Sequence, residues 1–346
     1  MSTPVAHTQE TVLQTRRSRV GRLMGVQVLG IGSSLGSKLI RNEDLAALGY
    51  DADWIVQRTG ILERRHAPPG ISTGDLATEA AEKCIAAAGV DRNQIDLLLL
   101  GTYTPDMLMP ATASVVQHRL GLTALAFDIQ AACASFVFAM LTAMQYIAAG
   151  CSRMALVVGA DCNSRILNPA DQRTYPLFGD AAGAVLLAPG SSQQGIVGYA
   201  VGSDGSGVDL LCRPMGGARE PFHPAGAKQG RHFLIMDGRP IFRWAIRMLR
   251  ESISDTLRVA NMTLDDVDLV IFHQANMRII SAAVEELGLN PANVFNNLER
   301  YGNTSSASIP LALDEAHRLG RIKPGDHILF SGFGGGLAWG TVLMRW

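Results

Sequence analysis

The feature that most constrains how this chain folds is an internal repeat. Residues 91–102 read DRNQIDLLLLGT and residues 263–274 read TLDDVDLVIFHQ, so that Asp96 and Asp268 lie 172 residues apart. Each segment follows a helical pattern and has four apolar residues directly after its aspartate, a run that favours a strand covered on both faces. Alternating helix and strand patterns of this kind predict an α/β protein.

Further matches extend the repeat along the chain at nearly the same offset. They are RLGL at 119–122 with ELGL at 286–289, ACAS at 132–135 with SSAS at 305–308, and MALVVG at 154–159 with HILFSG at 327–332. Four matches in one order predict two related halves, which we place at 25–190 and 191–346. Duplicated halves usually meet along a pseudo-twofold axis, where equivalent helix starts face one central site. Cys133 and its counterpart Ser306 both lie near such starts.

Composition excludes several broad classes of protein. The net charge is −1, which gives no indication of a nucleic-acid or acidic membrane partner. No apolar run approaches the roughly 18 residues of a spanning helix. The five cysteines are scattered and none has C-x-x-C spacing, so we expect neither a metal site nor a disulfide framework. Scattered free cysteines fit a protein of the reducing cytoplasm.

Residues 1–24 differ from the rest of the chain because they are polar and carry four closely spaced arginines. They lack the apolar segment of a secretory signal. We expect a disordered leader, with a targeting or docking arm as the alternative.

Cys133 is the first candidate for chemistry. It lies in AACASFVFAM, among small residues and just ahead of an expected helix. The positive end of that helix would favour a thiolate, and the Cys133 N–H could donate to an oxyanion. A buried thiol at a tight helix contact explains the small neighbours equally well.

Three other segments offer polar groups at strand ends or helix starts. The strand DLVIF delivers His273, followed by Asn276, to its carboxyl end, where ligands bind in α/β sheets. Asn303 precedes a helix in RYGNTSSAS, although a simple cap and turn would read the same way. GFGGG at 332–336 is followed by a strand pattern, so a backbone donor to a carbonyl fits it better than a phosphate loop.

Together these residues resemble the β-ketoacyl-acyl carrier protein synthase III family over about residues 25–346. The matching stretches are DADWIVQRTGILERR, DIQAACASF, FGDAAGAVLL, HQANMRIIS, YGNTSSASIPLALDEA and FGGGLAWG. The resemblance implies a thiolase-like fold, layered α-β-α-β-α, with two βαβαβ-type halves related by a pseudo-twofold. It also implies a homodimer.

The resemblance further implies a decarboxylative condensation that initiates type II fatty-acid synthesis. Cys133 would take the acyl group of an acyl-CoA, and malonyl-acyl carrier protein would then lose CO2 and attack it. His273 and Asn303 would stabilise the enolate, and the N–H groups of Cys133 and Gly336 would form an oxyanion hole. No metal or redox cofactor is implied.

The resemblance assigns the substrate contacts as well. Trp54 and Arg58 would hold the CoA adenine and phosphates, and Asn276 the pantetheine arm. Met109 would close the acyl pocket of the dimer partner, and its flexibility favours a primer longer than acetyl. Arg278, with Arg243 and Arg247, would contribute to a basic docking patch for the carrier protein.

Several positions depart from the family pattern. Gln172 stands where an arginine is typical, with Arg173 one step later, and Glu285 and Glu286 replace a basic pair in the docking surface. Two carboxylates there oppose an acidic carrier protein. These departures leave open a related acyltransferase or polyketide-starter enzyme of secondary metabolism. A Cys-His-Asn hydrolase and a non-catalytic scaffold are further alternatives.

Overall fold

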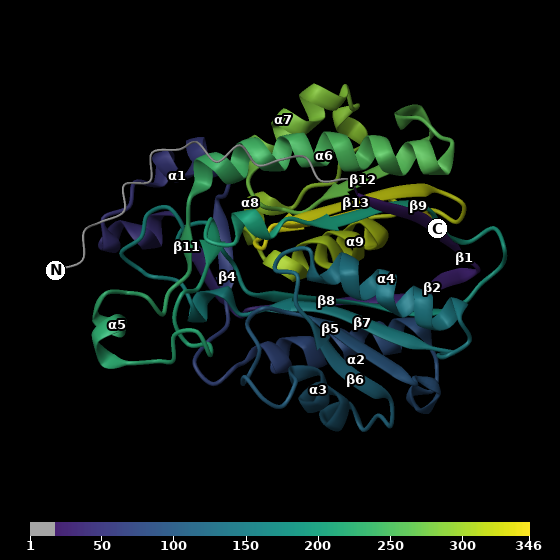
Figure 1. Ribbon diagram of the computed structural model, residues 1–346, viewed down its shortest axis with the longest axis horizontal. Coiled ribbons are helices and arrows are strands. Elements are labelled where there is room, and N and C mark those ends of the chain that lie inside the picture. The colour runs from purple at the N-terminus through teal and green to yellow at the C-terminus, as the bar shows by residue number, and fades with distance from the viewer. Residues whose placement is uncertain (1–17) are drawn as a thin grey trace.

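The structure is a computed structural model that describes residues 18–346, and two stacked five-stranded sheets form its framework (Figure 1). The first sheet has the order β2 (Val26–Leu35), β8 (Ala181–Pro189), β7 (Ala155–Asp161), β5 (Leu97–Gly101), β6 (Leu125–Ile129). The second has the order β1 (Arg19–Met24), β9 (Gly195–Ser203), β14 (Ala338–Arg345), β13 (His327–Gly334), β12 (Leu269–Phe272). Two short antiparallel pairs lie outside these sheets: β3 (Lys38–Arg41) with β4 (Glu63–His66), and β10 (Leu211–Cys212) with β11 (Ile235–Met236).

Helices separate and cover the sheets in five layers, which confirms the predicted α-β-α-β-α architecture (Figure 1). The central layer consists of α4 (Ser135–Ala148) and α9 (Ser308–Arg318), and the outer layers of α2 (Thr73–Ala88) with α3 (Thr112–Leu120) and of α6 (Gly238–Ala260) with α7 (Met277–Leu287). The remaining helices are short: α1 (Ala52–Thr59), α5 (Pro224–Lys228) and α8 (Leu298–Tyr301).

The central helices are apolar on nearly all sides because both sheets pack against them. Phe136 and Met140 on α4, four residues apart, and Ile309 and Leu313 on α9, also four apart, all belong to the central core. Fully burying such a side chain contributes about 1.5–3 kcal/mol. This burial fixes the positions of α4 and α9. Cys133 lies just before α4, and Asn303 lies in the segment that leads into α9.

The two halves repeat the same strand order, as the sequence offset predicted. Strands β2, β8, β7 and β5 correspond to β9, β14, β13 and β12, and a single bridge between Val270 and Val294 stands where β6 pairs with β5. The repeated aspartates make the same contact: Asp96 accepts the Arg153 N–H at 3.0 Å, and Asp268 accepts the His327 N–H at 2.8 Å. Each carboxylate ties the start of one strand to the start of its parallel neighbour.

The strand β1 corrects one prediction. We expected residues 1–24 to form a disordered leader, but residues 19–24 pair antiparallel with β9 and extend the second sheet. The backbone ladder holds this basic segment, and Arg22 adds a bond from its Nε to the Val259 carbonyl at 2.8 Å. The sequence pattern did not predict this strand, because the arginines of RVGRLM obscure the alternation of apolar and polar residues that is typical of a strand. Residues 1–17 lie outside the described part of the chain.

Two further observations concern the whole described region. Within residues 18–346, no helix combines the length and apolar character needed to cross a membrane. All five cysteines are free thiols.

Candidate active site

Cys133 lies in the turn between β6 and α4, two residues before the helix begins, and is 6% exposed. The preceding Ala132 has a left-handed φ of 47°, and Ser305, its counterpart in the repeat, has a φ of 55°. Two such strained turns at equivalent positions are an uncommon backbone feature for residues other than glycine. The same device thus presents a side chain at the start of each central helix.

Three candidate residues from distant parts of the chain meet at one cavity. Cys133, His273 and Asn303 all line a space of about 130 Å³, together with the aromatic ring of Phe333. The repeat predicted that equivalent helix starts would converge, and the cavity lies where they do. The thiol, imidazole and carboxamide can therefore act on one bound molecule.

Burial makes the Cys133 thiol a weak acid in this structure. Desolvation raises its pKa to about 12, and a hydrogen bond from the Ser305 hydroxyl to Sγ, at 3.3 Å, opposes that rise. We expected the helix start to favour the thiolate, but the surrounding apolar core outweighs it. The resting group is a thiol that must lose its proton as it reacts.

His273 follows β12 directly and is neutral. Its backbone N–H donates to the Ser331 carbonyl at 2.8 Å, which fixes it to β13. Burial lowers the pKa of the imidazole to about 3, and the ring meets Phe333 edge-on with centroids 5.3 Å apart. Its Nδ1 lies 2.7 Å from the Ser308 hydroxyl.

Asn303 is held by its backbone and by one side of its amide. Its N–H donates to the Leu177 carbonyl at 2.8 Å, and its own carbonyl accepts the Gly179 N–H at 3.0 Å. The side-chain Oδ1 accepts the Ser305 N–H at 2.9 Å. Since that contact uses the oxygen, the amide NH2 is the group available to the cavity.

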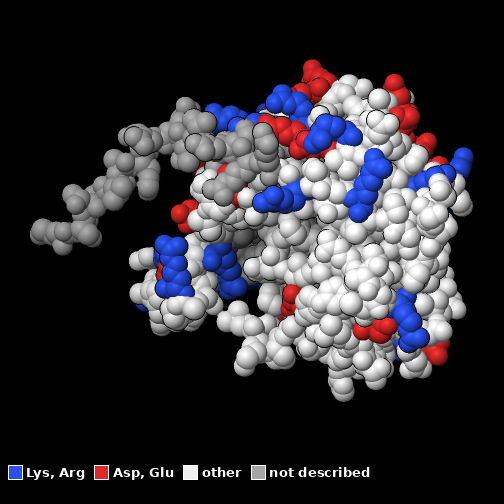
Figure 2. All heavy atoms as spheres, turned by 45° about the vertical axis from the view of Figure 1, so that its right-hand side comes forward, with Lys and Arg blue, Asp and Glu red and all other residues white. Residues whose placement is uncertain are grey.

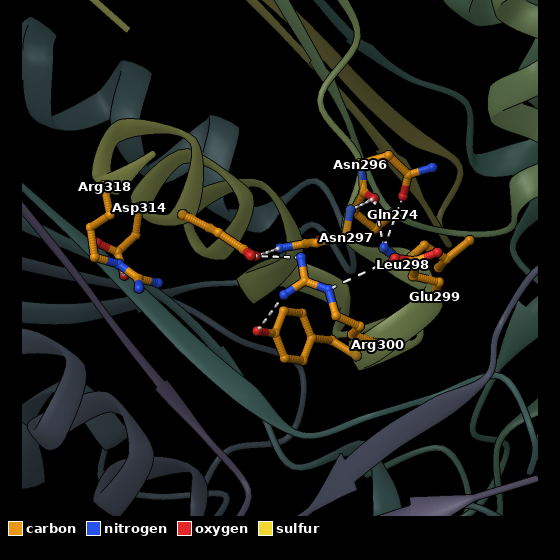
Figure 3. A network of polar contacts seen from close by, with 10 residues as sticks. Gln274, Asn296, Asn297, Leu298, Glu299, Arg300, Asp314 and Arg318 are labelled. Carbon is orange, nitrogen blue, oxygen red and sulfur yellow. Dashed lines mark hydrogen bonds and ion pairs between the residues drawn. The ribbon is translucent and has the colours of Figure 1, made fainter. Parts of the chain in front are cut away.

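A buried polar network surrounds Gln274, the residue that follows His273 (Figure 3). Gln274 accepts the N–H groups of Asn297 and Leu298 at 3.1 and 3.2 Å and donates to the Phe272 carbonyl at 2.8 Å. The Asn297 amide donates to Glu315 at 3.0 Å, and Arg300 pairs with the same carboxylate at 2.6 Å. These bonds join the end of β12 to α8 and α9.

The glycine run 334–336 lies between the cavity described above and a second cavity that also reaches Cys133. A Cβ at Gly334 would lie 2.6 Å from the Cys133 nitrogen, so glycine is required for this approach. Gly335 and Gly336 line this second cavity, which has a volume of about 590 Å³. We predicted Gly336 as the oxyanion donor. It shares this cavity with Cys133, and its role stays a prediction.

Comparison with known proteins agrees with this geometry. Sequence profiles of 3-oxoacyl-[acyl-carrier-protein] synthase III and of its C-terminal part match residues 127–205 and 257–346. The β-ketoacyl-[acyl-carrier-protein] synthase III of Rhodopirellula baltica is 50% identical, covering 94% of this chain and 100% of that protein. This chain belongs to the β-ketoacyl-[acyl-carrier-protein] synthase III family.

Two solved structures support membership of the synthase III family. The 3-oxoacyl-[acyl-carrier-protein] synthase III of Aquifex aeolicus is 37% identical with a TM-score of 0.86, covering 93% of this chain and 100% of that one. The priming β-ketosynthase of the R1128 polyketide pathway is 34% identical with a TM-score of 0.86, covering 94% and 98%. The thiolase-like fold predicted from the sequence is thereby confirmed.

The residues predicted to bind CoA lie around α1 and α7. Trp54 is 39% exposed, and the Arg58 guanidinium carbon lies 5.9 Å from the centre of its ring. Asn276 lines the smaller cavity and donates from its amide to the Arg58 carbonyl at 3.2 Å. This bond links the exposed tryptophan and arginine to the rim of the Cys133 site.

Met109 lies apart from its own active site. It is 85% exposed and lines neither cavity that reaches Cys133. Leu108 beside it is equally exposed, so the loop presents apolar side chains to the surroundings. That Met109 closes the acyl pocket of the dimer partner stays a prediction.

The departures from the family pattern have defined contacts. Gln172 donates to the Gly49 carbonyl at 3.4 Å, and Arg173 pairs with Asp171 of its own loop at 3.1 Å. Glu286 pairs with Arg250 on α6 at 2.9 Å, which neutralises one of the two unexpected carboxylates. Basic and acidic side chains are mixed over the region of α6 and α7 (Figure 2).

Sequence reasoning missed two serines in contact with the site, Ser305 and Ser308. Both lie in SSAS, which the repeat matched to ACAS, so the signal was present in the sequence. Their partners, Cys133 and His273, are far away along the chain, and only the folded structure reveals the contacts.

Proposed function

We propose that this chain condenses an acyl-CoA primer with malonyl-acyl carrier protein through an acyl-Cys133 intermediate, and so initiates type II fatty-acid synthesis. The observation that carries the proposal is the convergence of Cys133, His273 and Asn303 on one cavity. A neutral imidazole and a carboxamide can donate to a developing enolate without a repelling carboxylate. The relatives named as synthases of this type support the same reaction.

In the first step, Cys133 attacks the acyl-CoA thioester. The Ser305 hydroxyl and the start of α4 stabilise negative charge on Sγ as the proton leaves. The Cys133 and Gly336 N–H groups hold the oxyanion, CoA departs as the thiol, and the acyl chain enters the 590 Å³ cavity. Its Phe178, Leu211 and Leu234 side chains offer apolar contact to a chain longer than acetyl.

In the second step, the malonyl thioester binds in the smaller cavity. His273 and Asn303 donate to its thioester oxygen, and the C–C bond to the carboxylate breaks with release of CO2. The enolate carbon then attacks acyl-Cys133, and the thiolate leaves as the β-ketoacyl product forms. Proximity of both substrates, in two cavities that each reach Cys133, supplies the geometry for this step. The reaction requires no metal or redox cofactor.

The proposed partners follow from exposed features of the chain. A homodimer would cover the edge strand β6, where Leu125 is 54% exposed, and would bring Met109 to the partner's acyl cavity. Trp54 and Arg58 would bind CoA. Arg278 and Arg243 would contact the acidic carrier protein, although Glu285 weakens that surface. The free thiols fit a cytoplasmic setting.

Two alternatives differ in how the acyl enzyme is discharged. The R1128 priming β-ketosynthase supports a polyketide-starter enzyme as the second candidate, and a non-condensing acyltransferase would use another acceptor. A Cys-His-Asn hydrolase needs Asn303 to orient His273. Nδ1 of His273 contacts Ser308 instead, and Oδ1 of Asn303 accepts from Ser305, which argues against that relay.

Intact-protein mass spectrometry with a panel of acyl-CoAs tests the first step. We expect one acyl mass on the wild type and none on Cys133→Ala. Cys212→Ala is the matched control, because Cys212 lines the same large cavity and has no part in the proposed transfer. Labelling that survives in Cys133→Ala, or that disappears in Cys212→Ala, contradicts the proposal.

A further inference from the structure

The proposed chemistry of His273 depends on the hydrogen bond that its imidazole makes with Ser308. Its Nδ1 lies 2.7 Å from the Ser308 hydroxyl, and the two residues are 2% and 1% exposed. Ser308 is the first residue of α9, a helix fixed in the central core. The contact therefore has a fixed geometry and is shielded from water.

The donor in this hydrogen bond, Nδ1 of His273 or the Ser308 hydroxyl, can be identified by asking which choice leaves no buried N–H or O–H without an acceptor. A neutral imidazole carries one N–H, on either Nδ1 or Nε2. If Nδ1 donated to Ser308, the buried hydroxyl proton would need another acceptor, and within residues 18–346 its one recorded partner is Nδ1. Leaving a buried donor unpaired costs about 1–3 kcal/mol. The arrangement that satisfies both groups has Ser308 donating to Nδ1.

We propose that Ser308 is a positioning residue that holds His273 as the Nε2–H tautomer, so that the ring donates to the thioester oxygen of the malonyl substrate. This inference rests on the proposed condensation. With the other tautomer, the Nε2 lone pair would face the enolate oxygen and repel it. Ser308 thus acts on decarboxylation through His273 and touches no substrate itself.

The repeat supplies an internal comparison for this assignment. Ser135 occupies the equivalent position in the first half, and its hydroxyl donates to the Ala132 carbonyl at 2.6 Å and accepts the Ala131 N–H at 2.8 Å. Ser135 therefore braces its own turn, whereas Ser308 reaches across to β12. The same serine position serves a local contact in one half and the imidazole in the other.

The first readout is the tautomer itself, measured by long-range ¹H–¹⁵N NMR on wild-type enzyme labelled at histidine. The His273 signals are identified by their loss in His273→Asn. We expect the Nε2–H pattern in the wild type and a shift toward the Nδ1–H pattern in Ser308→Ala. A wild-type Nδ1–H pattern overturns the proposal even where Ser308→Ala does not fold.

The second readout is kinetic. Ser308→Ala should lower the rate of malonyl decarboxylation about 10- to 100-fold, with the KM for malonyl-acyl carrier protein and the acylation of Cys133 little changed. Ser308→Thr retains the hydroxyl and should recover most of the rate. Ser252→Ala, another buried helix serine with a side-chain bond to Thr341, controls for loss of stability and should decarboxylate normally.

The outcomes separate this inference from the proposed function. Wild-type decarboxylation by Ser308→Ala, or equal loss in Ser308→Thr and Ser308→Ala, contradicts the positioning role while acylation and condensation stand. If the wild type neither acylates Cys133 nor decarboxylates malonyl-acyl carrier protein, the proposed function fails, and the NMR pattern still decides the tautomer.

Discussion

The proposed active site has a structural counterpart across the pseudo-twofold axis, and the two differ in a few side chains. Cys133 and His273 correspond to Ser306 and Gly101: in the sheets, Leu100 pairs with Val158 as Phe272 pairs with Ser331. The Ser306 hydroxyl donates to the Gly101 carbonyl at 2.9 Å. That site is closed by its own hydrogen bonds, whereas the Cys133 site opens into two cavities.

The residue behind each turn accounts for much of this difference. Asp161 ends β7 and accepts the Ser306 N–H at 3.1 Å, while Gly334 occupies the corresponding end of β13 and packs against the Cys133 nitrogen. In one half, the Asp161 side chain accepts the hydrogen bonds of the Ser306 N–H and hydroxyl. In the other half, Gly334 has no side chain that could accept the Cys133 N–H. One backbone design thus serves stability at Ser306 and chemistry at Cys133.

The largest expected effect comes from removing the imidazole that the counterpart lacks. His273→Ala should lower malonyl decarboxylation about 10²- to 10³-fold, because one donor to the enolate is lost. Asn303→Ala should act in the same direction. Acylation of Cys133 should persist in both variants, since the hydrogen bond from the Ser305 hydroxyl to Sγ uses neither side chain. Decarboxylation near the wild-type rate in either variant, measured by CO2 release, contradicts their proposed role.

The second-largest effect is expected at the Ser306 site, where a substitution of Asp161 should change the free energy of unfolding. Asp161 is fully buried and accepts six hydrogen bonds from Thr102, Tyr103, Thr104 and Ser306. Asp161→Ala should lower the free energy of unfolding by about 3 kcal/mol, because several buried donors lose their acceptor. Exposed Asp265→Ala is the control, expected within about 0.5 kcal/mol in denaturant titrations. Equal stability of the two variants would remove Asp161 from the comparison.

Gly334→Ala tests the other side of the same contrast. A Cβ 2.6 Å from the Cys133 nitrogen must displace the turn that presents the thiol and its N–H donor. We expect about a 10²-fold slower acylation by acyl-CoA, measured by rapid-quench mass spectrometry. Gly217→Ala, where a Cβ meets nothing within 4 Å, is the control. Unchanged acylation in Gly334→Ala would show that the close approach is dispensable.

The smallest expected effect is on the pH dependence of stability. It arises from the buried His273 ring, because Gly101 at the equivalent position has no side chain to titrate. Burial lowers the pKa of His273 to about 3 from 6.5, so the unfolded chain binds a proton at pH values where the folded chain does not. Stability from the neutral ring is complete above pH 6.5 and is lost as pH falls toward 3. Relative to His273→Asn, the wild type should lose about 2 kcal/mol between pH 7.5 and 5 in urea titrations. Parallel pH profiles would contradict the burial of a neutral ring.

The offset between Asp96 and Asp268 predicted two related α/β halves, because each half repeats one strand order. The layered arrangement was predicted only through the family resemblance. The sequence missed β1, whose residues join the sheet through backbone bonds. It also predicted a stabilised thiolate at Cys133, and the structure raises that pKa instead, because burial depends on two packed sheets that local sequence does not encode. The contacts of Ser305 and Ser308 were hidden for the same reason.

The account's central claim is that Cys133, His273 and Asn303 perform acyl transfer and decarboxylation at one site. The most direct test is a single turnover of purified acyl-Cys133 enzyme with malonyl-acyl carrier protein, counting CO2 and β-ketoacyl product together. We predict one CO2 and one product for each acyl group discharged. Discharge of the acyl group to any acceptor without CO2 would contradict the claim and favour the non-condensing acyltransferase.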